Sequence, residues 1–411
     1  MKVQFLVLLS SRIASTAIQA VVFVLLARWA GAQDFGAIAI IAGVAAVLFT
    51  VSDWGLSSYI PRARAKGFNA EVAIGLRMDL LGNLAAGALF AVAVAIFAPA
   101  YGFSVWLGLV PFALAVEQFI EVGLTVPIAD GAKAILAISL LMRRLITLGV
   151  FLALFQGGVP ATSAYCIGVT LGAAVGLAHV LRVLRRRLPA TPDRVPIRSL
   201  YRTLTPYFLA NLSSQVRTLD TAIVGAVTSV GSAGLYSAAF RLVNPLMLVS
   251  SSVAAVVLPH ASRHTLPAAK RLGMRLTLAA ILFSLPLVPV VIYAEPIVVL
   301  LFGTTFSAAA PAFAWAVAAI PFLSLTSPLG GVLQSQGHEK YVAMNGIILA
   351  IVTLGLVLLG ALAWGPSGAA AGVTAAYTFK TASLLLRLLY TKAAVSPSAP
   401  RMPASHQDVT A

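Results

Sequence analysis

The stretch LLGNLAAGALFAVAVAIFA, residues 80–98, contains no charged side chain. A helix needs about 20 apolar residues to cross the roughly 30 Å hydrocarbon core of a bilayer. This stretch is long enough, and it predicts a transmembrane helix over residues 72–98. Runs of the same kind, separated by glycine, proline or polar residues, recur along the rest of the chain.

The overall composition agrees with a membrane protein. Of the 411 residues, 60% are hydrophobic and only 10% are charged, and the mean hydropathy is +0.97. Soluble globular proteins have roughly 25% charged residues. So few charges would leave large apolar patches on a soluble globule, which excludes a cytosolic enzyme.

The apolar runs predict an all-α integral membrane protein with about twelve transmembrane helices. The first run carries Arg12 and Arg28 and has no signal-peptide cleavage site, so we expect it to be a retained helix. The predicted spans are 4–30, 35–60, 72–98, 104–128, 131–155, 161–184, 202–228, 233–259, 272–302, 311–335, 341–364 and 367–391.

Basic residues are confined to alternate connectors between these spans. Cytoplasmic loops carry the excess of Lys and Arg, so this pattern places both termini in the cytoplasm. It also predicts a multi-pass protein of the inner or plasma membrane. Anionic membrane lipids facing these loops account for the net charge of +16, and no nucleic-acid partner is expected.

The chain divides into two similar halves. The connector at residues 185–200, rich in Arg and Pro, predicts a cytoplasmic linker between six-helix lobes at 1–184 and 201–392, and residues 393–411 a flexible cytoplasmic tail. FGAIAI at Phe35 has a counterpart in LYSAAF at Leu235, an offset of 200. Two halves of the same orientation form a parallel repeat, which is typical of alternating-access transporters.

Several stretches, in order, resemble a known family: LARWAGAQDFGAIAI (26–40), SDWGLSSYIPR (52–62), LDTAIVGAVTSVGSAGLYSAAFRL (219–242), LQSQGHEKY (333–341) and GPSGAAAGVTAAY (365–377). The chain resembles the O-antigen and exopolysaccharide flippases of the multidrug/oligosaccharidyl-lipid/polysaccharide (MOP) exporter superfamily. The resemblance implies a V-shaped pair of six-helix lobes. It also implies a transporter that moves a polyprenyl-pyrophosphate-linked oligosaccharide from the cytoplasmic to the outer leaflet, in partnership with polysaccharide assembly proteins.

Ionisable side chains inside spans are costly, so they form pairs or face a cavity. Glu117 and Glu121 share a helix face, and Arg143 and Arg144 reach a similar depth on the next span, which predicts an ion pair inside the first lobe. Asp220 and Arg241 face each other across a short hairpin and predict a second pair. Near the inner end of the third span, Asp79 and Arg77 predict a surface pair.

Other cations have no evident partner in the sequence, and these are the first candidates for a substrate cavity. Pyrophosphate carries concentrated negative charge, and arginine offers it permanently charged, bidentate donors. The leading candidates are Arg12, Arg217 and Lys380; Arg241, Arg28, Arg143 and Arg144 complete the predicted cationic set.

Four acidic residues are candidates for gating or for binding a coupling ion, either H⁺ or Na⁺. They are Asp53, Asp220, Glu117 and Glu121. A drug or organic-cation antiporter of the same superfamily is the main alternative, and it predicts a cavity dominated by such carboxylates. The basic bias of the charges within the spans favours the flippase.

Motifs for catalysis or cofactor binding are missing. The sequence has no GxxxxGK[ST] loop, HExxH or CxxC, and Cys166 is the only cysteine. We therefore predict no catalytic residue, cofactor or metal. A membrane glycosyltransferase or polymerase is the weaker alternative, because every predicted outer connector is short. A peptidoglycan-precursor flippase usually has two further helices, for which this chain has no residues left.

Overall fold

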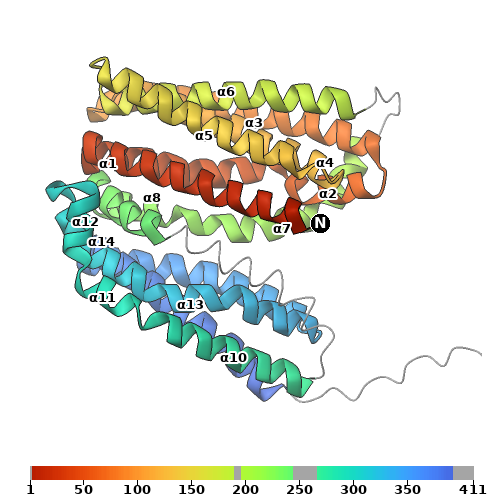
Figure 1. Ribbon diagram of the computed structural model, residues 1–411, viewed down its shortest axis with the longest axis vertical. Helices are drawn as coiled ribbons and strands as arrows, with labels where there is room; N and C mark the ends of the chain where they lie inside the picture. Colours follow the sequence, from red (N-terminus) through yellow and green to blue (C-terminus); the bar gives the residue numbers. More distant parts are fainter. Residues whose placement is uncertain (1, 189–195, 244–265, 392–411) are drawn as a thin grey trace, which may run out of the picture.

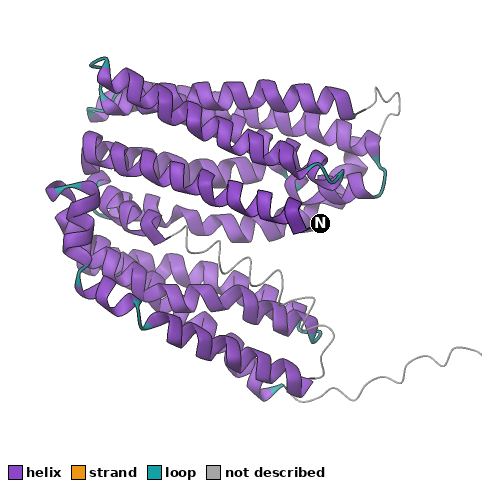
Figure 2. Cartoon of the chain, in the orientation of Figure 1, coloured by secondary structure: helices purple, strands orange, loops and turns teal. Residues whose placement is uncertain are grey.

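The computed structural model describes residues 2–188, 196–243 and 266–391, with side chains from Ser10 onward. The middle of the predicted linker, the second half of the predicted span 233–259 and the predicted tail lie outside the described residues. The described chain is helical and contains no strand, as Figure 2 shows. The prediction of an all-α protein is confirmed for this part of the chain.

The helices follow one another with short connections. The first half contains α1 (Lys2–Asp53), α2 (Leu56–Ala65), α3 (Asn69–Phe97), η1 (Ala98–Tyr101), η2 (Val105–Gly108), α4 (Leu109–Ala129), α5 (Lys133–Gln156) and α6 (Ala161–Arg187). The second half contains α7 (Ile197–Gln215), η3 (Val216–Leu219), α8 (Asp220–Val227), a helix at residues 230–243, α10 (Leu266–Ser284), α11 (Leu287–Ile292), α12 (Ala294–Phe302), η4 (Thr304–Ala309), α13 (Ala310–Ser335) and α14 (Glu339–Tyr390).

Seven helical segments of the described chain are long and apolar enough to cross a membrane. Two of them, Ser10–Asp53 and Glu339–Tyr390, contain 44 and 52 residues, far more than one crossing needs. Each is kinked near its middle, at Gly31 and at Trp364–Gly365. Gly31 and Gly365 lie between predicted spans, and Trp364 is the last residue of the predicted span 341–364. Gly31 has a φ of 80°, a conformation that favours glycine, so it separates the two arms of α1. The total of twelve spans and the cytoplasmic termini stay predictions.

The helices form two groups that are tilted relative to each other (Figure 1). Helices α1 to α6 lie together, with α5 packed on α6 and α4 packed on α3 and α6. Helices α10 to α14 form the other group, in which α13 packs on α14. Between them, α7 and α8 contact both α1 and α14, so they join the two groups.

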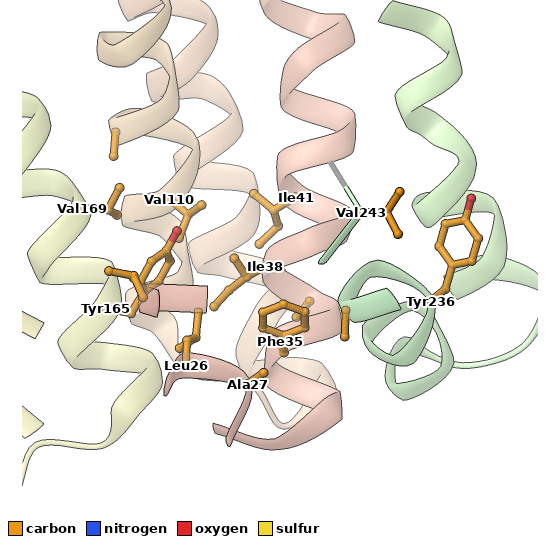
Figure 3. Close-up of a cluster of buried hydrophobic side chains, with 14 of the residues drawn as sticks. Leu26, Ala27, Phe35, Ile38, Ile41, Val110, Tyr165, Val169, Tyr236 and Val243 are labelled. Carbon is orange, nitrogen blue, oxygen red and sulfur yellow. The ribbon is translucent and has the colours of Figure 1, made fainter. Parts of the chain in front are cut away.

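Apolar side chains from both halves of the sequence share one core. Phe35 and Ile38 of α1 are buried in the same cluster as Tyr165 of α6 and Tyr236 of the helix at 230–243, and Figure 3 shows these four side chains. Glycine allows the backbones to approach closely here: a Cβ added to Gly36 would lie 1.9 Å from the carbonyl oxygen of Val230.

Candidate functional site

A cavity of about 720 Å³ lies between the helices of the two groups. Its wall is formed by α1, α4, α5 and α6 on one side and by η3, α8, the helix at 230–243, α13 and α14 on the other. The charged residues that line it are Glu117, Arg144, Arg217, Asp220 and Arg241. All five belong to the set of site residues predicted from the sequence.

The predicted ion pair of the first lobe is confirmed, and it is a network of four residues. The Nη2 atom of Arg143 lies 2.6 Å from Glu121, and its Nη1 atom lies 3.5 Å from Glu117. Arg144 donates to both carboxylate oxygens of Glu117, at 3.3 and 3.2 Å. The Arg143 side chain is only 1% exposed. On this side of the cavity, each arginine is therefore balanced by a carboxylate.

The predicted pair between Asp220 and Arg241 is wrong within the described residues. Asp220 accepts a hydrogen bond of 2.8 Å from the Tyr236 hydroxyl and a second one from Thr221. Arg241 contacts α1 instead of Asp220. Its guanidinium lies 3.8 Å from the ring centroid of Phe23 on α1. Its Nε atom donates to the hydroxyl of Ser237, at 3.0 Å.

Arg217 lies at the wall of the cavity in η3. Its guanidinium lies 5.5 Å from the ring centroid of Tyr377 on α14, a distance that allows a cation–π interaction. In the part of the chain that the structure describes, neither Arg217 nor Arg241 forms an ion pair with a carboxylate. Two cations of the second half thus line the cavity with aromatic rings and a hydroxyl as their partners.

Four of the predicted cations lie outside the wall of this cavity: Arg143, described above, and Arg12, Arg28 and Lys380. Arg12 is exposed on the first arm of α1. Arg28 is exposed too, and it donates to the carbonyl oxygen of Leu300 at 3.5 Å. Lys380 is half-buried on α14, one turn after Tyr377. Their predicted role as substrate ligands stays a prediction.

Asp53 lies at the end of α1, away from the cavity wall and buried against Asp79 of α3. It accepts hydrogen bonds from the backbone N–H and the hydroxyl of Ser57, at 2.9 and 2.8 Å. Asp79 accepts one from Asn83, at 2.8 Å, and its other oxygen accepts no hydrogen bond from a donor among the described residues. The predicted surface pair of Asp79 and Arg77 is wrong, since Asp79 is fully buried whereas Arg77 is exposed.

The Asp53 region is also where α7 contacts the first group of helices. Asn211 of α7 donates to the Ser57 hydroxyl and accepts from the Ser58 hydroxyl, both at 3.1 Å. The Arg62 guanidinium lies over the ring of Tyr207. A hydrogen-bonded chain therefore runs from Asp53 through Ser57 to α7.

A second charged cluster lies between α2, the turn after α4 and the end of α6. Asp130 accepts from Nε of Arg64 at 2.8 Å and from Nη1 of Arg187 at 2.9 Å. The hydrogen bond from Arg64, followed by that from Arg187, holds the pKa of the Asp130 carboxyl below its usual value. These basic residues, predicted to lie in cytoplasmic connectors, thus join three helices.

The polar and aromatic residues of the wall are not among those predicted from the sequence. Tyr165, Tyr236, Thr353 and Tyr377 all line the cavity. Neutral hydroxyls and rings are common inside membrane helices, so the sequence does not distinguish those that face the cavity from those that face lipid or core.

Comparison with known proteins gives a consistent result. The family described as "Polysaccharide biosynthesis protein" matches residues 3–265. The fold matches the lipid II flippase MurJ in an inward closed conformation with a TM-score of 0.71, at 16% identity over 93% of this chain and 87% of that chain. No curated protein matches the chain.

Transporters of the MATE family have the same fold. A multidrug-resistance MATE transporter of the MOP superfamily, in an inward-facing conformation, matches with a TM-score of 0.68, at 12% identity over 91% of this chain and 94% of that one. The MATE transporter VcmN of Vibrio cholerae matches with a TM-score of 0.60, at 13% identity over 94% of both chains.

Proposed function

Because the chain belongs to the polysaccharide biosynthesis protein family, we propose that it flips a polyprenyl-pyrophosphate-linked oligosaccharide from the cytoplasmic to the outer leaflet. A MOP-type transporter fold of apolar helices with a cavity between two helix groups supports this proposal. The resemblance described above adds the O-antigen and exopolysaccharide pathways as the setting. Transport of this kind changes no covalent bond of the substrate.

The observation that carries the proposal is the pair of cations, Arg217 and Arg241, on the cavity wall, neither of which forms an ion pair within 4 Å among the described residues. Asp220 is the carboxylate that interacts electrostatically with Arg217, and Tyr236 and Thr221 bind its oxygens. A pyrophosphate supplies the missing counter-charge, and the low dielectric of the cavity strengthens the contact. Arg143 and Arg144 are already paired with glutamates, so we assign them a structural role in holding α4 against α5.

The proposed transport cycle uses the cavity and the two groups of helices around it. In this proposal the protein lies in the inner membrane and both of its termini are in the cytoplasm. The pyrophosphate and glycan enter the cavity from the cytoplasmic side while the polyprenyl tail stays in lipid. The two lobes then close the inner side and open the outer side, as in other repeat transporters. Anionic lipids hold the basic connectors at the inner surface, and assembly proteins receive the glycan outside.

The coupling ion binds at buried carboxyl groups in this proposal. Asp53 and Asp79 contact each other in an apolar environment, where two like charges are costly, so a proton or Na⁺ bound between them relieves the repulsion. The hydrogen bonds from Asp53 through Ser57 to Asn211 connect this position to α7.

The test uses cells that lack the gene. We expect lipid-linked oligosaccharide to accumulate on the cytoplasmic face, out of reach of an impermeant glycan-modifying reagent. Arg217→Ala and Arg241→Ala should fail to restore export, whereas Arg77→Ala, which removes an exposed arginine of α3, should restore it. Full export by both cavity variants, at wild-type protein levels, contradicts the assignment of these arginines.

A drug or organic-cation antiporter is the second candidate function. Asp220 favours it, because this carboxylate lines the cavity and has no ion pair among the described residues. Glu117 does not, because it is bound by Arg144. Normal precursor turnover in the deletion strain, with a new sensitivity to cationic drugs, would favour the antiporter. A glycosyltransferase would instead show sugar transfer by the purified protein.

A further inference from the structure

Two hydroxyl groups in the cavity wall are buried without a hydrogen-bond partner among the residues that the structure describes. They are Oγ1 of Thr353 and the phenolic oxygen of Tyr377, and both residues line the cavity from α14. An unpartnered buried polar group costs about 1–3 kcal/mol, so such groups are rare unless another state or a ligand satisfies them.

The Thr353 hydroxyl differs from those of several other helical threonines. Thr50 donates to the carbonyl oxygen of Ala46 and Thr378 to that of Thr374, whereas Thr381 donates to the carbonyl oxygen of Phe322 on α13. Thr353 makes no such bond, although the carbonyl group four residues earlier is equally close along the helix. Its hydroxyl is therefore left without a partner among the described residues.

The fold brings the two hydroxyl-bearing residues to one level of the wall. The arms of α14 before and after its kink are antiparallel and very close, with Gly368 against Gly360 and Gly372 against Leu356. Thr353, three residues before Leu356, therefore lies opposite Ala375, three residues after Gly372. Tyr377 is only two residues further, about 3 Å along the helix axis.

Arg217 lies directly beside this position, over the ring of Tyr377 at 5.5 Å. In a polyprenyl-pyrophosphate-linked glycan, the first sugar is bonded to the pyrophosphate itself. A pyrophosphate held at Arg217 thus places that first sugar next to Tyr377 and Thr353. The two neutral hydroxyls can donate to and accept from the hydroxyl and amide groups of a sugar, whereas a polyprenyl tail offers them no hydrogen bond.

We infer that Thr353 and Tyr377 form a subsite for the sugar attached to the pyrophosphate, with the hydroxyls donating to or accepting from that sugar. The inference rests on the proposed function and goes beyond it, because it assigns recognition of the glycan to neutral residues of α14. Rotation about χ1 lets Thr353 reach the ligand, and Tyr377 supplies its ring as well as its hydroxyl.

The test compares two probes on purified protein in nanodiscs: polyprenyl pyrophosphate, and polyprenyl pyrophosphate carrying one N-acetylhexosamine. Tyr377→Phe and Thr353→Val remove one hydroxyl each and keep the shape. Each variant should weaken binding of the sugar-bearing probe about tenfold, the loss expected for one hydrogen bond, and change binding of the bare probe less than twofold. Thr378→Val, an exposed neighbour bonded to its own helix, is the matched control.

The outcomes separate this inference from the proposed function. Equal losses for both probes, or no loss for either, in variants that keep the wild-type unfolding temperature overturn the subsite alone. A wild-type protein that binds neither probe overturns the proposed function and the subsite with it. Arg217→Ala should weaken both probes alike, which identifies the pyrophosphate position independently of the sugar. If one α14 variant fails to fold, the other decides.

Discussion

The indole ring of Trp54 stacks on the phenyl ring of Phe208, with ring centroids 4.2 Å apart and planes 5° apart. Trp54 follows the last residue of α1, and Phe208 lies on α7, so the contact joins the two halves of the sequence. Trp54 has a positive φ of 47°, the only non-glycine residue of the described chain with this conformation. Gly55 beside it leaves no room: an added Cβ would lie 2.6 Å from the backbone nitrogen of Phe208. A strained and tightly fitted turn therefore holds α7 against α1 and α2.

If this contact opens during transport, a covalent link across it should stop the cycle. Ser58→Cys combined with Asn211→Cys replaces a hydrogen-bonded pair, at 3.1 Å, by two thiols. A short crosslinker that forms a disulfide with each thiol should block export, and a reducing agent that cleaves these disulfides should restore it. The native Cys166 is buried and should not react, so the wild-type chain is the control. Normal export by the crosslinked protein would show that the contact stays closed throughout.

The arginine–glutamate network should depend mainly on Glu117. Glu117 is nearly buried and contacts both arginines, whereas the Glu121 side chain is 51% exposed. Glu117→Gln leaves buried positive charge poorly compensated and should lower the free energy of unfolding by about 3 kcal/mol. Glu121→Gln should cost about 1 kcal/mol or less. Unfolding in detergent measures both, and the reverse order would contradict the assignment.

The cluster at Asp130 should make stability depend on pH. Hydrogen bonds from Arg64 and Arg187 lower the pKa of the Asp130 carboxyl in the folded protein. The stabilisation is therefore complete above the unfolded-state pKa of about 3.9 and disappears as the pH falls through the lower, folded-state pKa. Asp130→Asn should lower the unfolding temperature at pH 7 and make little difference near pH 2. A difference between the two proteins that is independent of pH would argue against this ionic origin.

Asp79 should tolerate a neutral isostere. Its carboxyl group lies beside Asp53, away from water and from any cation among the described contacts. Asp79→Asn removes a costly charge and should keep the unfolding temperature at or above that of wild type, while export falls if the carboxyl binds the coupling ion. Asp79→Ala, which leaves a void and an unpartnered Asn83, should lower the unfolding temperature. Wild-type export by Asp79→Asn would remove Asp79 from the coupling proposal.

The crossing of α1 with the helix at 230–243 should not accept a methyl group. A Cβ on Gly36 would lie 1.9 Å from the Val230 carbonyl oxygen, a backbone atom that cannot rotate away. Gly36→Ala should therefore reduce the free energy of unfolding by about 2 kcal/mol. Gly149→Ala on α5 is the control, because nothing lies within 4 Å of its added Cβ and alanine favours a helix. Equal stability of the two variants would contradict the close crossing.

Much of the fold was predictable from local chemistry. Apolar runs of membrane length must satisfy their backbone groups internally, so residues 80–98 could only be helical in a bilayer. The i and i+4 spacing of Glu117 and Glu121, opposite two adjacent arginines, was enough to predict their ion pairs. The family resemblance and the cavity arginines Arg217 and Arg241 also came from residues that are visible in the sequence.

The partners of the other charged residues depend on how each helix is rotated about its own axis. The spacing of residues in the sequence does not reveal how neighbouring helices are rotated. Asp220 and Arg241 were predicted to lie at matching depths, yet Tyr236 binds the first and the Phe23 ring covers the second. Asp79 and Arg77 are two residues apart, and the helix turns one into the core and the other outward. The twist of each helix and the side chains of its neighbours decide such choices.

The sequence by itself determined that this chain is an all-helical membrane protein of a polysaccharide-exporter type, because hydrophobicity, charge and motif order are local properties. Only the tertiary structure decided which cations are left unpaired at the cavity, that Asp53 meets Asp79, and that Thr353 and Tyr377 share one wall. The physical reason is that each of these relationships joins residues from different helical segments. Their distances are set by how closely glycines such as Gly36 and Gly372 let the helix backbones approach.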